Sequence, residues 1–412
     1  MTAPPVYVLG GYQTDFAVNY AKQGRTIVDI ILDTVRGTLS ATRIGPREID
    51  AAHVGNFIGE LMCYQGHLGA FFLEADPAFS GLPTARHEAA CASGSIATLA
   101  AMAEIESGRD DCVCVLGVEM ERNLPGAETA AHLGVAAWHA RECVGVKYPW
   151  PMLFSRLGDE YEKRYGLDDS HLRAIGRINF ANAKRNPNAQ TRTWTLTDES
   201  FSDDPEKNPV VEGRVRRQDC SQVTDGGAAV ILASKNFAED YARRNGIAID
   251  RIPRILGWGH HTARIAFDDK IAESQDSPYV LPHVRNTIVD AFARAGVSGI
   301  EAIDAIETHD CFTTTEYMAI DHFGITKPGE SWKAIEEGTI AFDGKTPINP
   351  SGGLMGVGHP VGASGVRMLL DAYKQVTGAA GEYQVADAKR AATLNIGGSG
   401  TTSVSFVVGA GA

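Results

Sequence analysis

The chain has 412 residues, a length that excludes a small single-core module and favours several domains or one large α/β enzyme. Hydrophobic residues make up 44% of the sequence and charged residues 22%, which excludes a disordered or collagen-like chain. With 38 basic and 51 acidic residues the formal net charge is −13, and this charge opposes non-specific binding to nucleic acid or to anionic membranes.

The sequence carries no sign of export or of membrane insertion. Its start lacks the basic and apolar regions of a secretory signal, and no stretch has the roughly 18 apolar residues that span a bilayer. Its 7 cysteines include no Cys-x-x-Cys pair, so neither a disulfide framework nor a zinc ribbon is indicated. We therefore expect a cytoplasmic protein without a membrane partner or a nucleic-acid partner.

A weak internal duplication runs along the chain. Each half opens with a strand, a helix with one apolar face, and a second strand that begins with Ile-Asp-Ala. Each half then continues with an Ala-Ser-Gly turn that opens a helix, and ends with a glycine pair before an apolar strand. These predicted elements cover 6–12, 27–39, 49–56, 91–108 and 225–234 in the first half, and 251–259, 284–292, 303–310, 362–378 and 395–408 in the second.

The duplication predicts two similar α/β halves, with parallel-rich sheets covered by helices on both faces. Between 123 and 219 the composition changes, because aromatic residues, Pro and Asn become frequent and strand alternation disappears. We interpret 123–219 as an insertion that forms a substrate-binding lid or wall, with a solvent-facing decoration as the alternative. The predicted domains are 1–122 and 220–250 for the first half, 123–219 for the insertion, and 251–412 for the second half.

Cys91 lies before Ala-Ser-Gly-Ser at the predicted start of an amphipathic helix. Free backbone N–H groups and the helix dipole stabilise a thiolate at such a position, which suits a nucleophile. A small buried cysteine that packs a turn is an equally good interpretation of the position alone. Cys112 and Cys114 lie two apart in one apolar strand and fit core packing instead.

Two histidines occupy positions typical of ligand sites. His359 lies in the glycine-rich segment GGLMGVGHPVGASG (352–365), directly before a predicted helix, and the glycine spacing matches no phosphate or dinucleotide motif. His309 opens the triplet His-Asp-Cys (309–311) at the carboxyl end of a predicted strand, where open α/β sheets place ligand sites. For His309 alone, a partly buried structural histidine remains the alternative.

Together these segments resemble the thiolase family. The motifs occur in the family's order over nearly the whole chain. They are CASGS (91–95), DGGAA (225–229), HDCF (309–312), GHPVGASG (358–365) and NIGGSG (395–400). HDCF is most similar to the sterol-carrier-protein-type thiolases and their bacterial relatives. The resemblance implies a five-layer αβαβα fold with two duplicated five-stranded halves and an inserted loop domain. It also implies an acyl-CoA C-acyltransferase that cleaves 3-ketoacyl-CoA with CoA or runs the reverse condensation.

The resemblance also implies roles for individual residues. Cys91 would take up the acyl group, and His359 would activate Cys91 and then help to hold the thioester oxygen. His309 would help to form the oxyanion site for the enolate of the second acyl-CoA. The backbone N–H of Gly397 would join that of Cys91 in the oxyanion hole of the acyl-enzyme.

The chain departs from the commoner thiolase pattern at its last motif. Asn395 stands where other thiolases carry a second cysteine, the acid/base that moves the α-proton. Cys311 would supply this thiol instead, as in the sterol-carrier-type relatives, on the same side of the chain as His309. The alternative is that Cys311 packs beneath the site while a water or His309 moves the proton.

The resemblance implies coenzyme A as a substrate, no bound cofactor and no metal, and a homodimer or homotetramer. Basic residues that could meet the phosphates of coenzyme A are candidates by charge only, and solvated surface is the alternative for all of them. They are Lys184, Arg185, Arg214, Arg216 and Arg217.

Two other kinds of function remain open. One is another enzyme of the superfamily. It could be a ketoacyl-synthase-like or hydroxymethylglutaryl-CoA-synthase-like condensing enzyme, although Cys311 argues against this. It could also be a steroid side-chain aldolase, although Cys91 argues against that. The other is a non-catalytic acyl-CoA-binding or scaffold subunit. The presence of Cys91 together with both histidines makes a scaffold the weaker hypothesis.

Overall fold

The internal duplication is visible in the strand order of the central sheet. The computed structural model describes residues 3–410, and nine strands form one sheet. From one edge to the other they are β3 (Thr84–His87), β2 (Ala51–Gly55), β4 (Cys112–Glu119), β7 (Gly226–Ala233), β1 (Val6–Gln13), β8 (Pro253–Thr262), β11 (Thr402–Ala410), β10 (Arg390–Gly397) and β9 (Ala305–Thr308). The first half supplies β3 to β1 of this order, and the second half repeats the order inward from the opposite edge.

The second half has four of its five expected strands among the described residues. In the place that corresponds to β3 it has a single parallel bridge between Ile306 of β9 and Ile348. Pro347 and Pro350 flank Ile348, and proline has no N–H to donate to a ladder. The fifth strand is therefore reduced to one bridge.

The expectation of parallel-rich sheets is wrong. Among the described strands, β2 is parallel to β3 and β4, and β9 is parallel to β10, whereas the other neighbouring pairs are antiparallel. The apolar runs that suggested parallel strands have another cause. Every residue of β4 is buried because helices cover both faces of the sheet.

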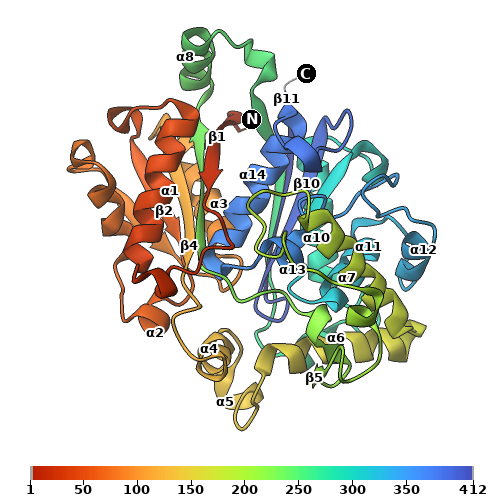
Figure 1. Ribbon diagram of the computed structural model, residues 1–412. Coiled ribbons are helices and arrows are strands. Elements are labelled where there is room, and N and C mark those ends of the chain that lie inside the picture. Colours follow the sequence, from red (N-terminus) through yellow and green to blue (C-terminus); the bar gives the residue numbers. More distant parts are fainter. Residues whose placement is uncertain (1–2, 411–412) are drawn as a thin grey trace.

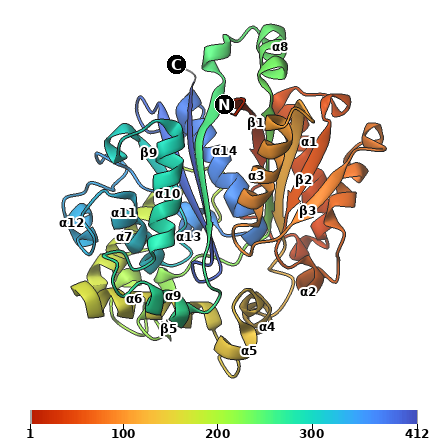
Figure 2. The ribbon, with the colours of Figure 1, turned by 180° about the vertical axis from the view of Figure 1, so that it is seen from behind.

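The two halves of the sheet, which β1 and β8 join through only two residue pairs, form two of the five expected layers, and helices form the other three (Figure 1 and, from behind, Figure 2). The outer layers contain α1 (Ile27–Thr42) in the first half and α10 (Pro282–Ala295) in the second. Between the two halves lie α3 (Ser93–Glu106) and α14 (Ser364–Thr377), whose side chains form one buried cluster with the inner faces of the strands. The helix that follows Cys91, α3, is therefore covered on both sides and does not present the polar face that an amphipathic helix would have.

The predicted insertion contains four helices and a two-stranded hairpin. These are α4 (Gly126–Leu133), α5 (His139–Glu142), α6 (Pro149–Tyr165), α7 (Asp169–Ala183), β5 (Val210–Glu212) and β6 (Val215–Arg216). Although it is inserted in the first half, it packs on the second, because α6 and α7 share a buried cluster with α11 (Thr313–Phe323). The domain boundaries stay a prediction.

The remaining helices are short, apart from α8 (Lys235–Asn245), which follows β7. The short helices are α2 (Gly59–Cys63), α9 (Phe267–Glu273), α12 (Ser331–Glu336) and α13 (Gly353–Val357). Within residues 3–410, no helix combines the length and apolar character needed to cross a bilayer. The predicted domains 1–122 and 251–412 include Met1, Thr2, Gly411 and Ala412, which lie outside the described residues.

Glycines let the backbone that precedes α14 lie directly against the first turn of α3 and the ends of β2 and β4. A Cβ atom on Gly94 would lie 2.7 Å from the carbonyl oxygen of Gly362, and one on Gly362 would lie 2.7 Å from Cα of Asn56. Similarly, a Cβ on Gly117 would lie 2.6 Å from Cα of Ala363. Side chains do not fit at such distances, so the contact depends on bare backbone at these positions.

We predict that Gly94→Ala lowers the free energy of unfolding by about 1–3 kcal/mol, the usual cost of overpacking a closed site. Denaturant unfolding measures this change. Gly126→Ala is the matched control, because a Cβ at Gly126 meets no atom within 4 Å. An unfolding midpoint for Gly94→Ala that equals that of the wild type would contradict the packing described here.

Candidate active site

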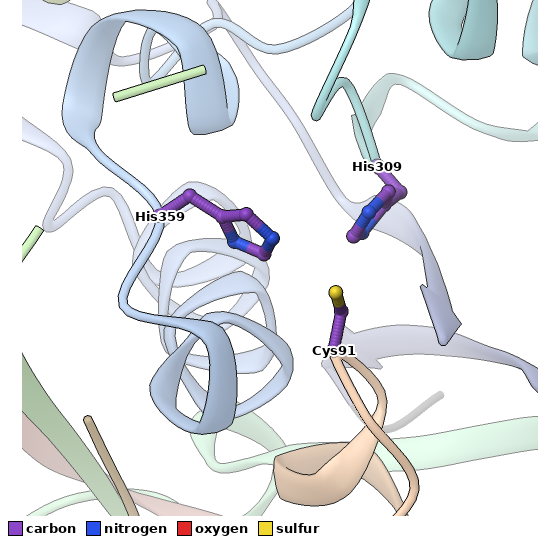
Figure 3. A group of neighbouring side chains, drawn as sticks. All are labelled: Cys91, His309 and His359. Carbon is purple, nitrogen blue, oxygen red and sulfur yellow. The ribbon is translucent and has the colours of Figure 1, made fainter. Parts of the chain in front are cut away.

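Three reactive side chains from distant parts of the chain meet at the amino ends of the central helices. The sulfur of Cys91 and ring nitrogens of His309 and His359 lie within 4.8 Å of one another. Figure 3 shows both rings pointing toward the sulfur. Cys91 precedes α3, His309 follows β9, and His359 lies between α13 and α14. The site therefore combines one residue of the first half with two of the second.

Cys91 follows a strained turn. Ala90 has φ of +51°, in the left-handed region that residues other than glycine avoid. Ser93 closes this turn, because its hydroxyl donates to the carbonyl of Ala90 at 2.6 Å and accepts the N–H of Ala89 at 2.9 Å. A sharp turn before a helix exposes the nucleophile in other enzymes, and the backbone here has that shape.

The free thiol of Cys91 is protonated at neutral pH. Burial raises its pKa to about 12, and the nearby carboxyl group of Glu121 acts in the same direction. The backbone N–H groups of Gly398 and of Cys91 itself lower the pKa, but by less. Backbone N–H groups thus stabilise the thiolate in the expected direction, but in the free protein burial outweighs them.

His359 is a neutral base with a fixed tautomer. Its Nδ1 lies 2.7 Å from Oγ of Ser364, and that hydroxyl donates its hydrogen to the carbonyl of Pro360 at 2.9 Å. Ser364 must then accept a hydrogen from Nδ1, which leaves Nε2 without a proton. Among residues 3–410, Nε2 has no hydrogen-bond partner. Burial and the charge of Arg367 lower the pKa of His359 to about 3, so the ring is neutral at physiological pH.

His309 lies across the site from His359, with ring centroids 5.2 Å apart and planes at 84°. Its Nδ1 is 3.2 Å from the side-chain nitrogen of Asn395, and its Nε2 has no partner among the described residues. Burial and the neighbouring His359 and Arg367 lower its pKa well below the usual range, so this ring is also neutral.

The residues after His309 point alternately to opposite sides. The carboxylate of Asp310 points away from the site and accepts the N–H groups of Leu354 at 2.6 Å and Met355 at 3.3 Å. Both residues belong to α13, which ends one glycine before His359. Asp310 therefore connects the two histidine-bearing segments, a role that sequence reasoning did not assign.

Cys311 returns to the side of the site and lines the same pocket as Cys91. Its sulfur lies 3.6 Å from Oγ1 of Thr315. Burial, followed by the neighbouring Cys91, raises the pKa of Cys311 well above the usual range, so it is a thiol in the free protein. Its position fits the predicted acid/base, and that role stays a prediction.

The glycine pair after β10 lies against the Cys91 turn. The backbone N–H of Gly398 faces the Cys91 sulfur closely enough to lower its pKa. A Cβ on Gly397 would clash with the carbonyl oxygen of Ala89. Gly398 was not singled out from the sequence, and the predicted role of the Gly397 N–H stays a prediction. Lys270 holds this loop, because its buried ammonium donates to Oγ of Ser399 at 2.9 Å.

A pocket of about 440 Å³ opens beside Cys91 and Cys311. Its walls are largely aromatic and aliphatic, and several come from the predicted insertion. They include Phe57, Leu133, Trp150, Phe154, Trp194 and Phe312. Such walls favour an apolar ligand segment, with the reactive residues at one end.

The basic residues proposed from charge occupy different places. Arg217 lines the Cys91 pocket and is exposed. Lys184 and Arg185 line a separate hollow. Arg214 is enclosed by carboxylates of α6 and α7, and Arg216 donates to a backbone carbonyl. Only Arg217 is therefore placed to meet a ligand that also reaches Cys91.

One thiol and two imidazoles are also a donor set that zinc accepts. Proximity alone therefore fits either a metal centre or a nucleophile with two assisting histidines. The environment of His309 argues for the second. Its Nδ1 faces the side-chain nitrogen of Asn395, which can only donate, so the proton of the neutral ring lies on Nε2 and that atom cannot bind a metal.

Comparison with known proteins identifies the family. A model described as "Thiolase C-terminal domain-like" matches residues 267–410. The acetyl-CoA acetyltransferase of Methanothermobacter thermautotrophicus is 31% identical over 403 residues, which cover 97% of each chain. Human sterol carrier protein 2 is 27% identical over 413 residues, covering 97% of this chain and 71% of that protein.

Solved structures share the fold. Human mitochondrial 3-ketoacyl-CoA thiolase in complex with CoA superimposes with a TM-score of 0.69 at 19% identity, covering 99% of this chain and 98% of that one. An Ltp2–ChsH2(DUF35) aldolase superimposes with a TM-score of 0.77 at 17% identity, with the same coverage. At these identities the likeness shows the architecture, which confirms the predicted duplicated five-layer fold. With the full-length relatives, it establishes that the chain belongs to the thiolase superfamily and is a thiolase-type acyltransferase.

Proposed function

We propose that the protein transfers acyl groups through an acyl-enzyme on Cys91, cleaving 3-ketoacyl-CoA with CoA or running the reverse condensation. The observation that carries this proposal is the pairing of a thiol with the bare Nε2 of a neutral His359 at the end of an apolar pocket. The names of the full-length relatives support acetyl-CoA as one of the substrates.

In the first half-reaction, Nε2 of His359 removes the proton of Cys91, and the thiolate attacks C3 of the 3-ketoacyl-CoA. The backbone N–H groups of Cys91 and of the 397–398 turn stabilise the oxyanion that forms. When the bond between C2 and C3 breaks, the acyl group stays on Cys91 and the electron pair becomes the enolate of acetyl-CoA. His309 stabilises the enolate oxygen, and Cys311 gives the proton to C2.

In the second half-reaction, a CoA thiol attacks the thioester on Cys91. Before this attack, the proton that His359 took from Cys91 passes to the thiolate of Cys311, so that both side chains are neutral again. His359 then takes the proton of the incoming thiol and returns it to the sulfur of Cys91 as the new acyl-CoA leaves. A thioester is exchanged for a thioester, so neither direction is strongly downhill. The same residues therefore serve both cleavage and condensation.

Further elements of the proposal follow from the family. Coenzyme A is a substrate rather than a bound cofactor, and the reaction uses no metal. The protein is a cytoplasmic homodimer or homotetramer that acts in lipid metabolism, such as fatty acid β-oxidation. The insertion supplies much of the wall that contacts the acyl chain, which the aromatic residues of the pocket support.

Acyl transfer to Cys91 can be tested by mass spectrometry. Wild-type protein is incubated with acetyl-CoA or a longer acyl-CoA and quenched in acid, and its peptides are mapped. We expect one acyl group on the peptide that contains Cys91. Cys91→Ser should fold and lack the adduct, and His359→Ala should acquire it roughly 10²–10³ times more slowly. An adduct on another cysteine, or stoichiometric zinc without any adduct, would contradict the proposal.

The role of Cys311 can be separated from that of Cys91. We predict that Cys311→Ala still forms the acyl-enzyme but loses exchange of the α-hydrogens of acetyl-CoA with deuterated water, because the acid/base is missing. Cys220→Ala is the matched control, since Cys220 lines the same pocket. Exchange at a near wild-type rate in Cys311→Ala would assign the proton transfer to another group.

A further inference from the structure

Asn395 joins the helix of the nucleophile to one of the two histidines. It lies in β10, and its side chain is 1% exposed. Its side-chain oxygen accepts the hydroxyl of Ser95 at 2.8 Å, and its side-chain nitrogen lies 3.2 Å from Nδ1 of His309. Ser95 is in the first turn of α3, four residues after Cys91. One buried amide therefore connects both halves of the site.

The amide of Asn395 has its oxygen toward Ser95 and its nitrogen toward His309. Because Oδ1 accepts the hydroxyl hydrogen of Ser95, the NH₂ group faces His309 and donates to its Nδ1. A ring nitrogen that accepts a hydrogen bond carries no proton. A neutral His309 must then carry its only proton on Nε2, the atom that faces the reaction space without a protein partner.

The second histidine has the opposite arrangement. Ser364 accepts a hydrogen from Nδ1 of His359, and this leaves Nε2 as a bare acceptor. Two neutral imidazoles thus present the same atom to one space in different states, one as an acceptor and one as a donor. With two acceptors the site could not stabilise an oxyanion through a ring, and with two donors it would have no imidazole base.

We propose that Asn395 is a positioning residue that fixes His309 as its Nε2–H tautomer, so that His309 donates to a substrate oxygen while His359 acts as the base. That this substrate oxygen is the enolate oxygen of the second acyl-CoA rests on the proposed function. This role also accounts for an asparagine where other thiolases have a cysteine. An amide cannot move the α-proton, but it can hold its hydrogen toward Nδ1, a task that requires the Ser95 partner.

The tautomer of His309 can be measured directly in the free enzyme. Protein labelled with ¹⁵N-histidine is examined by NMR through the couplings between ring nitrogens and ring hydrogens, with the His309 signals assigned from their loss in His309→Gln. We expect a protonated Nε2 and an unprotonated Nδ1 for His309, and the reverse for His359. A protonated Nδ1 of His309 in the wild-type enzyme overturns the proposal without the need for any variant of Asn395.

Asn395→Asp tests the cause. A carboxylate can only accept, so the proton of His309 should move to Nδ1, or the ring should become doubly protonated with a higher pKa. Thr98→Val is the matched control, because Thr98 lies on the same helix and bonds only the carbonyl of Gly94 among the described residues. An unchanged His309 tautomer and pKa in Asn395→Asp would overturn the proposal.

Kinetics separate positioning from simple structural support. In Asn395→Asp, exchange of the α-hydrogens should fall by roughly 10²-fold more than acylation of Cys91 does, with a new pH dependence from the titration of His309. If α-hydrogen exchange and acylation of Cys91 fall equally and the pH profile is unchanged, the positioning role of Asn395 is contradicted. The NMR measurement uses no acyl-CoA, so a missing acyl-enzyme with the expected tautomers would refute the proposed function and leave the assignment of Asn395 intact.

Discussion

The active site depends on close backbone contact between two turns, the first turn of α3 and the turn that precedes α14. Gly94 makes this approach possible because a Cβ there would lie 2.7 Å from the carbonyl oxygen of Gly362, while Gly362 itself lies against the backbone at the ends of β2 and β4. Two carboxyl groups at the end of β4 hold the second turn, since Glu119 accepts the N–H of Gly362 at 3.0 Å and Glu121 that of Val361 at 2.8 Å. Because the two turns belong to different halves of the duplicated fold, their contact brings a thiol from one half to the imidazoles of the other.

The same packing decides the charge state of the site. Burial raises the pKa of Cys91 to about 12 and lowers that of His359 to about 3, so the resting pair is a neutral thiol and a neutral imidazole. Its reactivity therefore arises when an acyl-CoA enters and proton transfer is coupled to attack. Two polar side chains, Ser364 behind His359 and Asn395 behind His309, then decide which ring accepts a proton and which donates a hydrogen bond.

Much of this arrangement could be predicted from the sequence. The repeated segments indicated two halves, and the motifs around Cys91, His309 and His359 predicted that these residues meet, as the structure shows. Strand direction could not be predicted, because an apolar run reports burial rather than orientation. The supporting residues were also beyond reach, since their contacts join segments far apart in the chain. They are Glu119, Lys270, Asp310, Ser364 and Gly398.

The neutral resting pair can be tested by the pH dependence of Cys91 alkylation. The free enzyme is treated with iodoacetamide, and modification of the Cys91 peptide is followed by mass spectrometry. A thiol with a pKa of about 12 should react about tenfold faster with each pH unit between 7 and 10, because only its thiolate fraction reacts. A rate that is already constant above pH 6 would show a thiolate–imidazolium pair in the free enzyme and would contradict this account.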